Sequence, residues 1–501
     1  MFTIKILMVA LYVLTLVFIG WYSSRQTETT SDFFLGGRSI GPWLSAFAYG
    51  TTYFSAVIFI GYAGKIGWGF GLSSLWIVAG NALVGTLLAW LVLARRTREM
   101  THRLEAMTMP EFLSVRYDSK GLKIISALLI FVFLVPYSAS VYMGLSYMFE
   151  QFFNVPFSTA MFAMAIITAI YLIWGGYRAV ALSDFIQGTI MIFGVFVLIY
   201  FVIGSPEVGG VAQGIAKLKA INPSLTAAVG APGPIALFSL VILTSLGPWG
   251  LPQMTQKFYA IKSENFIKKA AVVSTIFAVI IGFGAYFVGS FSHIFFPESP
   301  PLVDGVPNAD LIMPLIMEQT MPELAAVLIL LLILSASMST LASLVLVSSS
   351  AIAIDLAKGG LFPDMNHQKV KLLMRILCGV FIALSLFLAL RPNVILTLMA
   401  FSWGTVAGAF LAPYVIGLFW QGATKIGAWA AMLSGAGISI VGSIIFPANV
   451  PTVGSIAMIA PLGVLVIVSL ITPKFSEAHL SHVFGKATTT AEIVSDDEGA
   501  A

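Results

Sequence analysis

Long apolar runs follow one another along almost the whole sequence, and they constrain the fold more than any other feature. A helix needs about 20 mainly apolar residues to cross a bilayer. Runs of this kind give approximate spans at 4–23, 41–66, 70–94, 122–150, 155–175, 181–203, 233–257, 266–294, 324–356, 371–390, 394–420, 424–447 and 452–472. Charged residues make up only 10% of the chain, against about 25% in soluble proteins. The sequence therefore predicts an all-α polytopic membrane protein with about thirteen transmembrane helices.

Basic residues indicate the orientation, because cytoplasmic loops carry an excess of Lys and Arg. With the N-terminus outside, the basic loop 95–121 lies inside, and the acidic loop 295–323, which has no Lys or Arg, lies outside. A further basic cluster also falls inside, and its members are Lys257, Lys262, Lys268 and Lys269. We therefore expect a multi-pass protein of the cell membrane with a cytoplasmic C-terminus.

The polar residues exclude several classes of function. The single cysteine, Cys378, lies in an apolar run, and the five histidines lack the spacing of metal ligands. No catalytic set of His, Cys or carboxylate residues converges within the spans, so we expect neither an enzyme nor an organic cofactor. No polar linker separates the spans, so residues 1–475 are expected to form one transmembrane domain and residues 476–501 a short disordered cytoplasmic tail.

Two of the expected spans are interrupted near their middle. The second contains "YGTTYFSA", and the seventh contains "TSLGPWGLPQ", in which Pro248 and Pro252 each remove a backbone donor. Unwound backbone is tolerated at this depth where it lines a cavity within the protein. The breaks lie five spans apart, which predicts inverted repeats at about 41–203 and 233–420, as in secondary transporters. The alternative is that membrane helices simply contain more Gly and Pro than soluble ones.

The ninth expected span carries hydroxyl side chains on one face. Ser335, Ser339 and Ser343 recur every four residues, and Thr340 lies beside Ser339. Hydroxyls, together with carbonyls of an unwound helix, are oxygen ligands of the kind that a hard cation prefers. The same spacing also lets membrane helices pack closely, and both interpretations remain open. Asp184, near the start of the sixth span, is either an intramembrane ion ligand or a helix N-cap at the interface.

Taken together, these stretches resemble the sodium:solute symporter family. The matching pieces are "FFLGGRSIGPW", "GGYRAV" followed by "DFIQG", "GLPQ" and "MSTLASLVLVSSSAIAIDL". The resemblance covers about residues 5–475 and implies a leucine-transporter-type fold with a 5+5 inverted repeat. It also implies a secondary active transporter that carries a small organic solute into the cell with sodium by alternating access.

The resemblance further implies a sodium site between the second and ninth spans. The ligands would be backbone and hydroxyl oxygens of Thr51, Phe54, Ala336, Ser339 and Thr340. Some relatives hold a second sodium with an aspartate at the position of Asp184 and nearby serines. Ser343 matches that pattern, but Ala342 stands where another serine is expected, which puts a second ion in doubt.

The solute is expected between the second, fourth, seventh and eleventh spans. The expected lining is Thr52, Tyr53, Ser55, Tyr137, Ser140, Pro248, Trp249 and Pro252, with Phe401 and Trp403 as an outer gate. The first break lacks the amides and carboxylates with which a sugar site would pair hydroxyls. We therefore expect a carboxylate, such as a pantothenate-like compound or a monocarboxylate, or an amino acid such as proline. Proline carriers of the family have an acidic residue at the position of Tyr53, which counts against a simple proline assignment.

Two alternatives to sodium symport remain at this point. The first is coupling to protons, and the second is a membrane sensor that binds a solute without moving it. The tail after residue 475 is too short for a signalling domain, which counts against the sensor. The expected partners are a small-molecule substrate, the sodium ion and the lipid bilayer, without nucleic acid, and the expected functional unit is a monomer.

Overall fold

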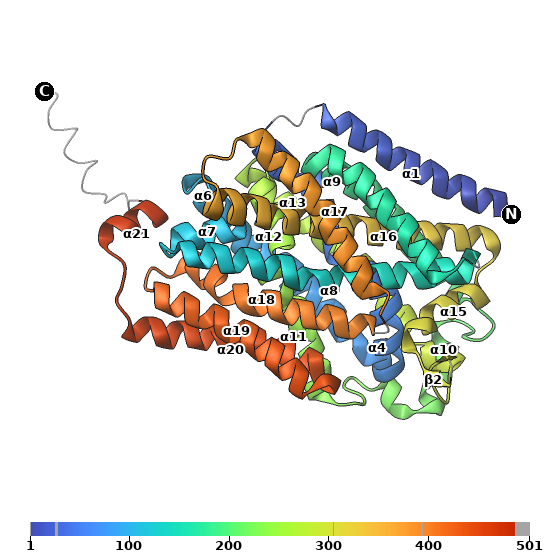
Figure 1. Ribbon diagram of the computed structural model, residues 1–501. Coiled ribbons are helices and arrows are strands. Elements are labelled where there is room, and N and C mark those ends of the chain that lie inside the picture. Colours follow the sequence, from blue (N-terminus) through green and yellow to red (C-terminus); the bar gives the residue numbers. More distant parts are fainter. Residues whose placement is uncertain (1, 26–28, 154, 304, 392–393, 486–501) are drawn as a thin grey trace, which may run out of the picture.

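The computed structural model describes residues 2–25, 29–153, 155–303, 305–391 and 394–485, and helices make up nearly all of these ranges (Figure 1). The elements of the first half are α1 (Phe2–Ser24), α2 (Thr30–Leu35), η1 (Gly36–Arg38), α3 (Pro42–Tyr53), η2 (Ile58–Tyr62), α4 (Ala63–Phe70), η3 (Gly71–Ser74), α5 (Leu75–Ala82), η4 (Leu83–Ala94), α6 (Arg95–Arg103), α7 (Met109–Arg116), α8 (Lys120–Phe153), α9 (Phe157–Ile203), α10 (Val211–Ile221) and η5 (Pro223–Thr226).

The second half begins with the pair α11 and α12, which is bent by 45° between its two helices. Its elements are α11 (Pro234–Gly250), α12 (Pro252–Ala260), η6 (Glu264–Phe266), α13 (Ile267–Gly289), α14 (Ser292–Phe295), β1 (Leu302–Val303), β2 (Val306–Pro307), η7 (Ala309–Leu311), α15 (Ile312–Thr320), α16 (Glu323–Ser350), η8 (Ala351–Leu361), α17 (His367–Ala389), α18 (Ile395–Phe419), α19 (Lys425–Ile445), η9 (Pro447–Asn449), α20 (Val450–Ile471) and α21 (Glu477–Phe484). The strands β1 and β2 pair antiparallel, with Leu302 opposite Pro307.

Ten helical segments of the described residues are long and apolar enough to cross a bilayer, and an eleventh is counted if α11 and α12 form one span. This count is lower than the expected thirteen for two reasons. Residues 58–103 run as one helical stretch. The second part of α9, Gly176–Ile203, counts as a span, whereas the first part contributes only the shorter apolar helix Phe157–Ile170, because the helical geometry is interrupted at Gly176, where φ is 58°.

Large apolar side chains cover the outward faces of these helices. Phe193, Ile235, Ile444 and Ile471 are between 66% and 81% exposed. Soluble monomers rarely expose apolar patches of more than a few hundred Å², whereas the hydrocarbon of a bilayer solvates such side chains. The surface and the spans therefore agree with the membrane protein that the composition predicts.

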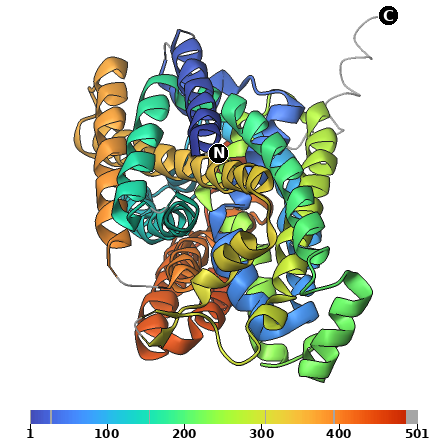
Figure 2. The same cartoon turned by 90° about the vertical axis from the view of Figure 1, so that its right-hand side faces the viewer.

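The helices α16 and α18 form the interior of the bundle, since 89% of the most apolar window of each is buried. Figure 1 and the rotated view in Figure 2 place α1 on one side of the molecule and the pair α19 and α20 on the other. The central helices, with the interrupted α3 packed on α16 and α9, are therefore shielded from lipid. Polar side chains on them can only contact protein or an enclosed ligand.

The expectation of a disordered tail is wrong for the helix α21. Ser476 caps the helix by accepting a hydrogen bond from the His479 N–H. Arg103 donates to the Val483 carbonyl at 3.1 Å, and the Arg116 guanidinium lies 4.9 Å from the Phe484 ring centroid. A cation over an aromatic face and a charge-assisted hydrogen bond thus hold α21 against the bundle. The expected tail continues into residues 486–501, which lie outside the described residues.

Candidate functional site

The helix α3 ends in the middle of the bundle without a proline. Phe54 takes an extended conformation, with φ −105° and ψ 93°, and regular geometry resumes only after Ser55. The last carbonyls of α3 therefore lose their helical partners. Thr51 and Thr52 are at most 1% exposed, so water cannot satisfy these groups. Buried backbone carbonyls of this kind require partners from elsewhere in the protein.

The hydroxyls of α16 supply those partners. Ser339 Oγ and Thr340 Oγ1 lie 3.1 and 3.2 Å from the Thr51 carbonyl oxygen. Ser339 Oγ also lies 3.2 Å from the carbonyl oxygen of Ala336 on its own helix. Four of the five expected sodium ligands are therefore joined by direct contacts. The fifth, Phe54, lies at the break, where its N–H donates to the Gly50 carbonyl at 3.0 Å. Neutral hydroxyl and carbonyl oxygens brought together in this way fit a sodium ion.

A small cavity of about 20 Å³ lies at the break of α3, next to these oxygens. Its lining comes from both sides of the first break and from the helices facing it: Tyr53, Phe54, Ser55, Val57, Ile58, Tyr62, Asn81, Tyr137, Thr244, Tyr286, Met399 and Trp403. None of these described residues is charged, and each is at most 7% exposed. The cavity is therefore lined by buried side chains, and its free space is close to that of one water molecule, so a solute would need these side chains to move apart.

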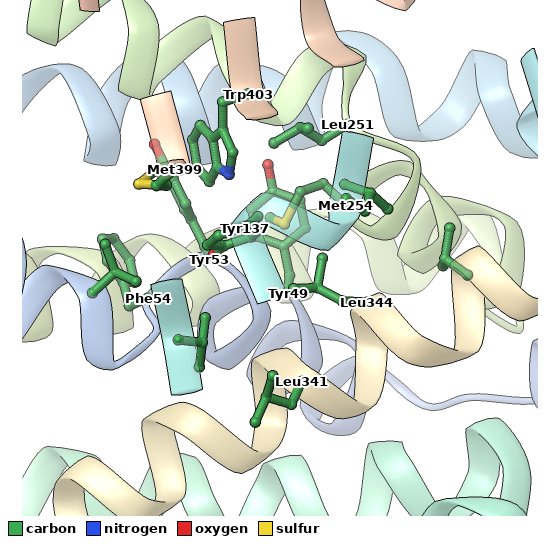
Figure 3. Close-up of a cluster of buried hydrophobic side chains, with 14 of the residues drawn as sticks. Tyr49, Tyr53, Phe54, Tyr137, Leu251, Met254, Leu341, Leu344, Met399 and Trp403 are labelled. Atoms are coloured by element: carbon green, nitrogen blue, oxygen red, sulfur yellow. The ribbon is translucent and has the colours of Figure 1, made fainter. Parts of the chain in front are cut away.

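Aromatic rings from three helices form the wall of this cavity. Trp403 stacks on Tyr53 with ring centroids 6.1 Å apart, and Tyr137 meets the same indole edge-on at 5.7 Å. Figure 3 shows Trp403 and Met399 reaching from α18 toward Tyr53 and Tyr137. Gly247 makes room for the indole, because a Cβ there would lie 2.5 Å from Trp403 Cε3. The break of α11 thus shapes the cavity, because Gly247 leaves room for the Trp403 indole.

The Tyr53 side chain also connects the two interrupted helices. Its phenolic O–H donates to the Thr244 carbonyl of α11 at 2.7 Å. Both groups are buried, with Tyr53 5% and Thr244 3% exposed. This buried hydrogen bond fixes the position of α3 relative to α11, so a movement of one helix would displace the other.

Of three donors at the cavity wall, two have no hydrogen-bond partner among the described residues. These two are the phenolic hydroxyl of Tyr62 and the indole Nε1 of Trp403, whereas the third, the Tyr137 hydroxyl, lies beside the hydroxyls of Ser55 and Thr340. Leaving a buried donor unsatisfied costs about 1–3 kcal/mol. A ligand rich in acceptor oxygens would remove that cost, which makes the cavity suited to a carboxylate.

Only part of the expected substrate set lines the cavity. Tyr53, Ser55 and Tyr137 do, together with Trp403 of the expected gate. The Thr52 hydroxyl instead lies 2.9 Å from Ser343 Oγ. Ser140 donates to the Tyr137 carbonyl at 2.7 Å, because a hydroxyl in a helix readily bonds to the preceding turn.

The residues expected from the second break lie elsewhere. The Trp249 indole donates to the Val84 carbonyl at 2.9 Å, and Pro252 lines a separate hollow beside Asp355. Pro248 lies within α11 and is not part of the cavity lining. Phe401 packs edge-on against Phe133 at 5.8 Å, since residues two apart on a helix point to different faces. Trp403 alone of the expected gate pair reaches the cavity.

Several lining residues were missed in the sequence. Asn81 is a lone amide in an apolar run, and this polarity could have identified it. Tyr62, Tyr286 and Met399 give no such signal, because aromatic and methionine side chains are common in any buried core. Only the folded arrangement distinguishes them from packing residues.

The surroundings of Asp184 correct the sequence interpretation of Lys257, which placed that lysine in a cytoplasmic loop. Lys257 is 0% exposed, and its Nζ lies 3.1 Å from Ser343 Oγ. The bend between α11 and α12 turns the lysine into the bundle, where it faces Asp184. Of the two residues expected to hold a second sodium, Ser343 contacts the Lys257 ammonium and Asp184 lies within the field of its charge.

The chain matches known proteins over most of its length. The model of the sodium:solute symporter family matches residues 33–435. The osmoregulated proline transporter OpuE of Bacillus subtilis (strain 168) is 30% identical over 446 residues, which cover 87% of this chain and 88% of that protein. A sodium/proline symporter of Staphylococcus aureus (strain bovine RF122 / ET3-1) is 32% identical over 449 residues, with coverage of 87% and 85%.

Solved structures share the fold at low sequence identity. The substrate-bound outward-open structure of a Na⁺-coupled sialic acid symporter superposes with a TM-score of 0.76 at 17% identity, covering 95% of this chain and 99% of that one. Mhp1, a nucleobase-cation-symport-1 family transporter in a closed conformation, gives a TM-score of 0.57 at 14% identity and covers 92% of this chain and 100% of its own. These likenesses concern the fold alone.

Proposed function

This chain belongs to the sodium:solute symporter family and is a multi-pass, sodium-coupled symporter of a small solute; from this premise we propose that its cargo is a small organic monocarboxylate. The observation that carries the proposal is the pair of unpartnered donors, on Tyr62 and Trp403, at the wall of an uncharged cavity that the Tyr137 hydroxyl also lines. A carboxylate would accept from these donors, and the apolar remainder of the solute would pack on the surrounding rings. A sugar would leave its own donors without acceptors in this lining.

Proline is the second candidate, because two similar proteins are named as proline carriers. Its carboxylate would use the same donors. Its ammonium group would need an acceptor, and Asn81 Oδ1 already lies 3.3 Å from the Ser245 hydroxyl. Tyr53, which stands where family proline carriers have an acidic residue, offers a phenol instead of a negative charge. The lining therefore ranks proline below an uncharged or purely anionic solute.

We assign the sodium site to the oxygens of Thr51, Phe54, Ala336, Ser339 and Thr340. The contacts between Thr51 and the α16 hydroxyls support this assignment, because they join the ion site to the break that also lines the solute cavity. A sodium ion bound there would hold the end of α3 against α16. The ion and the solute would then each raise the affinity for the other.

We propose alternating access between two inverted repeats of five helices, with the N-terminus outside and the C-terminus in the cytoplasm, in a bundle whose described residues give ten or eleven spans. The closed cavity corresponds to an intermediate between outward and inward openings. Repeats rocking around a fixed midplane site would expose it to either side. We propose a monomer as the functional unit, with sodium as coupling ion and no organic cofactor. We propose sodium rather than the proton as the coupling ion, because the oxygens assigned to the ion site belong to neutral hydroxyl and carbonyl groups.

Uptake into proteoliposomes tests the cargo. Purified protein is given labelled monocarboxylates, pantothenate, proline or a sugar under a sodium gradient, a proton gradient or neither. We expect a monocarboxylate to accumulate with the sodium gradient alone. One sodium and one monovalent anion carry no net charge, so a membrane potential would leave this uptake unchanged. Proline with one sodium would move one charge, worth about 2.3 kcal/mol per 100 mV, and exclusive, potential-driven uptake of proline would refute the monocarboxylate proposal.

A further inference from the structure

A buried polar seam outside the solute cavity contains an unusual pair of opposite charges. Lys257 of α12 and Asp184 of α9 are both 0% exposed. The Asp184 carboxylate lies beside the Thr51 hydroxyl and within the field of the Lys257 ammonium. Isolated charges are rarely buried, because removal from water is costly unless another charge compensates. The seam therefore needs each member of this pair to balance the other.

The ammonium of Lys257 is held by groups from several helices. It donates to Ser343 Oγ of α16 at 3.1 Å and lies 5.2 Å from the ring centroid of Tyr177 on α9. Lys257 is the positive charge that faces Asp184. The ammonium thus contacts a hydroxyl oxygen and an aromatic face and is attracted by a carboxylate. These are the interactions that a bound cation would make.

This position is directly linked to the sodium site. Ser343 Oγ also lies 2.9 Å from the Thr52 hydroxyl, and Thr52 follows Thr51, whose carbonyl contacts Ser339 and Thr340. Ser343 lies one helical turn beyond Ser339 on the same face of α16. The ammonium therefore occupies one of two neighbouring cation positions along α16, and the other position has only neutral oxygens.

We propose that Lys257 is a built-in cation that takes the place of a second sodium ion, so that the protein binds a single sodium per chain. The inference rests on the proposed sodium site described above. A free cation at Asp184 and Ser343 would lie beside the ammonium and be repelled by it. The covalently attached charge neutralises Asp184 without being drawn from the sodium gradient, and one sodium remains to drive the solute.

Counting bound sodium tests this inference without transport. Purified full-length protein in lipid nanodiscs is titrated with ²²Na⁺ by equilibrium binding. We expect one saturable ion per wild-type chain and two per Lys257→Met chain, in which Asp184 is left uncompensated. Lys257→Arg retains the positive charge and should bind one ion. The double variant Asp184→Asn, Lys257→Met has neither charge and should also bind one.

The outcomes separate the inference from the function on which it rests. Two ions on the wild-type chain would refute the built-in cation while leaving the first sodium site intact. No saturable binding to the wild type would refute the sodium site and the inference together. If Lys257→Met lost stability but still bound one ion, the pair would be purely structural, which also contradicts the inference. Lys262→Met, which changes an exposed lysine of the neighbouring loop, controls for surface charge, and the wild-type count decides if a variant does not fold.

Discussion

The two interruptions of the bundle occupy corresponding places in the sequence but differ in chemistry. At the first, α3 ends at Tyr53 without a proline, and its freed carbonyls meet the hydroxyls of α16. At the second, Pro252 begins α12 after a 45° bend, and a Cβ on Gly250 would lie 2.9 Å from the Ala407 carbonyl oxygen of α18. The first break supplies oxygens of the proposed sodium site, whereas the second shapes the cavity and directs Lys257 into the bundle. Two breaks in one bundle therefore need not have equivalent roles.

The largest expected effect comes from removing the hydroxyls that distinguish the first break. The double substitution Ser339→Ala and Thr340→Ala deletes two ion ligands, each worth about 1.5–3 kcal/mol for a charged partner. We expect sodium affinity to fall by at least about 100-fold, measured by ²²Na⁺ binding. Ser337→Ala is the matched control, because that hydroxyl bonds only the Ile333 carbonyl of its own helix. Equal affinity in the double variant and the control would contradict the ion site.

A second substitution tests the role of the second break in shaping the cavity. Gly247→Ala would place a methyl group 2.5 Å from Trp403 Cε3, so the indole must move. Overpacking of this kind costs about 1–3 kcal/mol, and we expect the KM for the solute to rise roughly 10-fold in uptake assays. Sodium binding in the absence of solute should change little. Gly437→Ala, where no heavy atom lies within 4 Å, is the control, and an equally small effect at both glycines would show that the indole does not define the site.

A smaller effect is expected from the hydrogen bond that joins the breaks. Tyr53→Phe retains the ring stacked on Trp403 but removes the donor to the Thr244 carbonyl. Loss of such a bond costs about 0.5–1.5 kcal/mol, so we expect coupling between sodium and solute affinity to weaken by roughly 2- to 10-fold. Tyr49→Phe removes a similar bond to the Gly85 carbonyl that does not connect the breaks. If the two variants weakened coupling equally, the bridge would have no special role.

The smallest predicted effect concerns pH at the loop that packs on α18. Asp310 accepts a hydrogen bond from the Ile395 N–H at 3.2 Å, and burial raises the pKa of Asp310 from 3.8 to about 6. Protonation of Asp310 favours this closed form over an open form in which Asp310 is exposed to water. The stabilisation is fully present below about pH 3.8 and is lost as the pH rises through about 6.

Acidification of the outer solution from pH 7 to 5 should therefore slow opening and reduce uptake about twofold. Asp310→Asn should flatten the pH profile in this range, with initial rates of uptake as the measurement. Lys65, whose charge lowers the pKa of Asp310, provides a check, because Lys65→Met should move the midpoint of the profile upward. An unchanged profile in Asp310→Asn would assign the pH dependence to another group.

The sequence predicted the parts of this account that depend on local chemistry. Apolar runs predicted the membrane helices, the glycine and proline residues marked both breaks, and the four-residue spacing of Ser335, Ser339 and Ser343 placed them on one helical face, with Thr340 beside Ser339. The family resemblance linked that face to Thr51. These features are readable because they depend on helical periodicity or on backbone constraints within a few residues.

Features set by long-range packing could not be read in the same way. Lys257 resembles its basic neighbours in sequence, and only the bend after Gly250 turns it toward Asp184. Tyr62 and Tyr286 become cavity residues through the packing of separate helices. The division of the apolar runs into spans was also uncertain, because a helical turn such as η3 carries no marked drop in hydrophobicity.

The central claim is that an ion between the first break and α16 controls solute affinity. It is tested most directly by measuring solute binding to the wild type and to Thr340→Ala at zero and saturating sodium, and ²²Na⁺ binding at zero and saturating solute. For the wild type, we predict that each ligand tightens the other by the same factor, as linkage requires. In Thr340→Ala this factor should fall toward one. A Thr340→Ala protein that retained the wild-type factor in both directions would contradict the account.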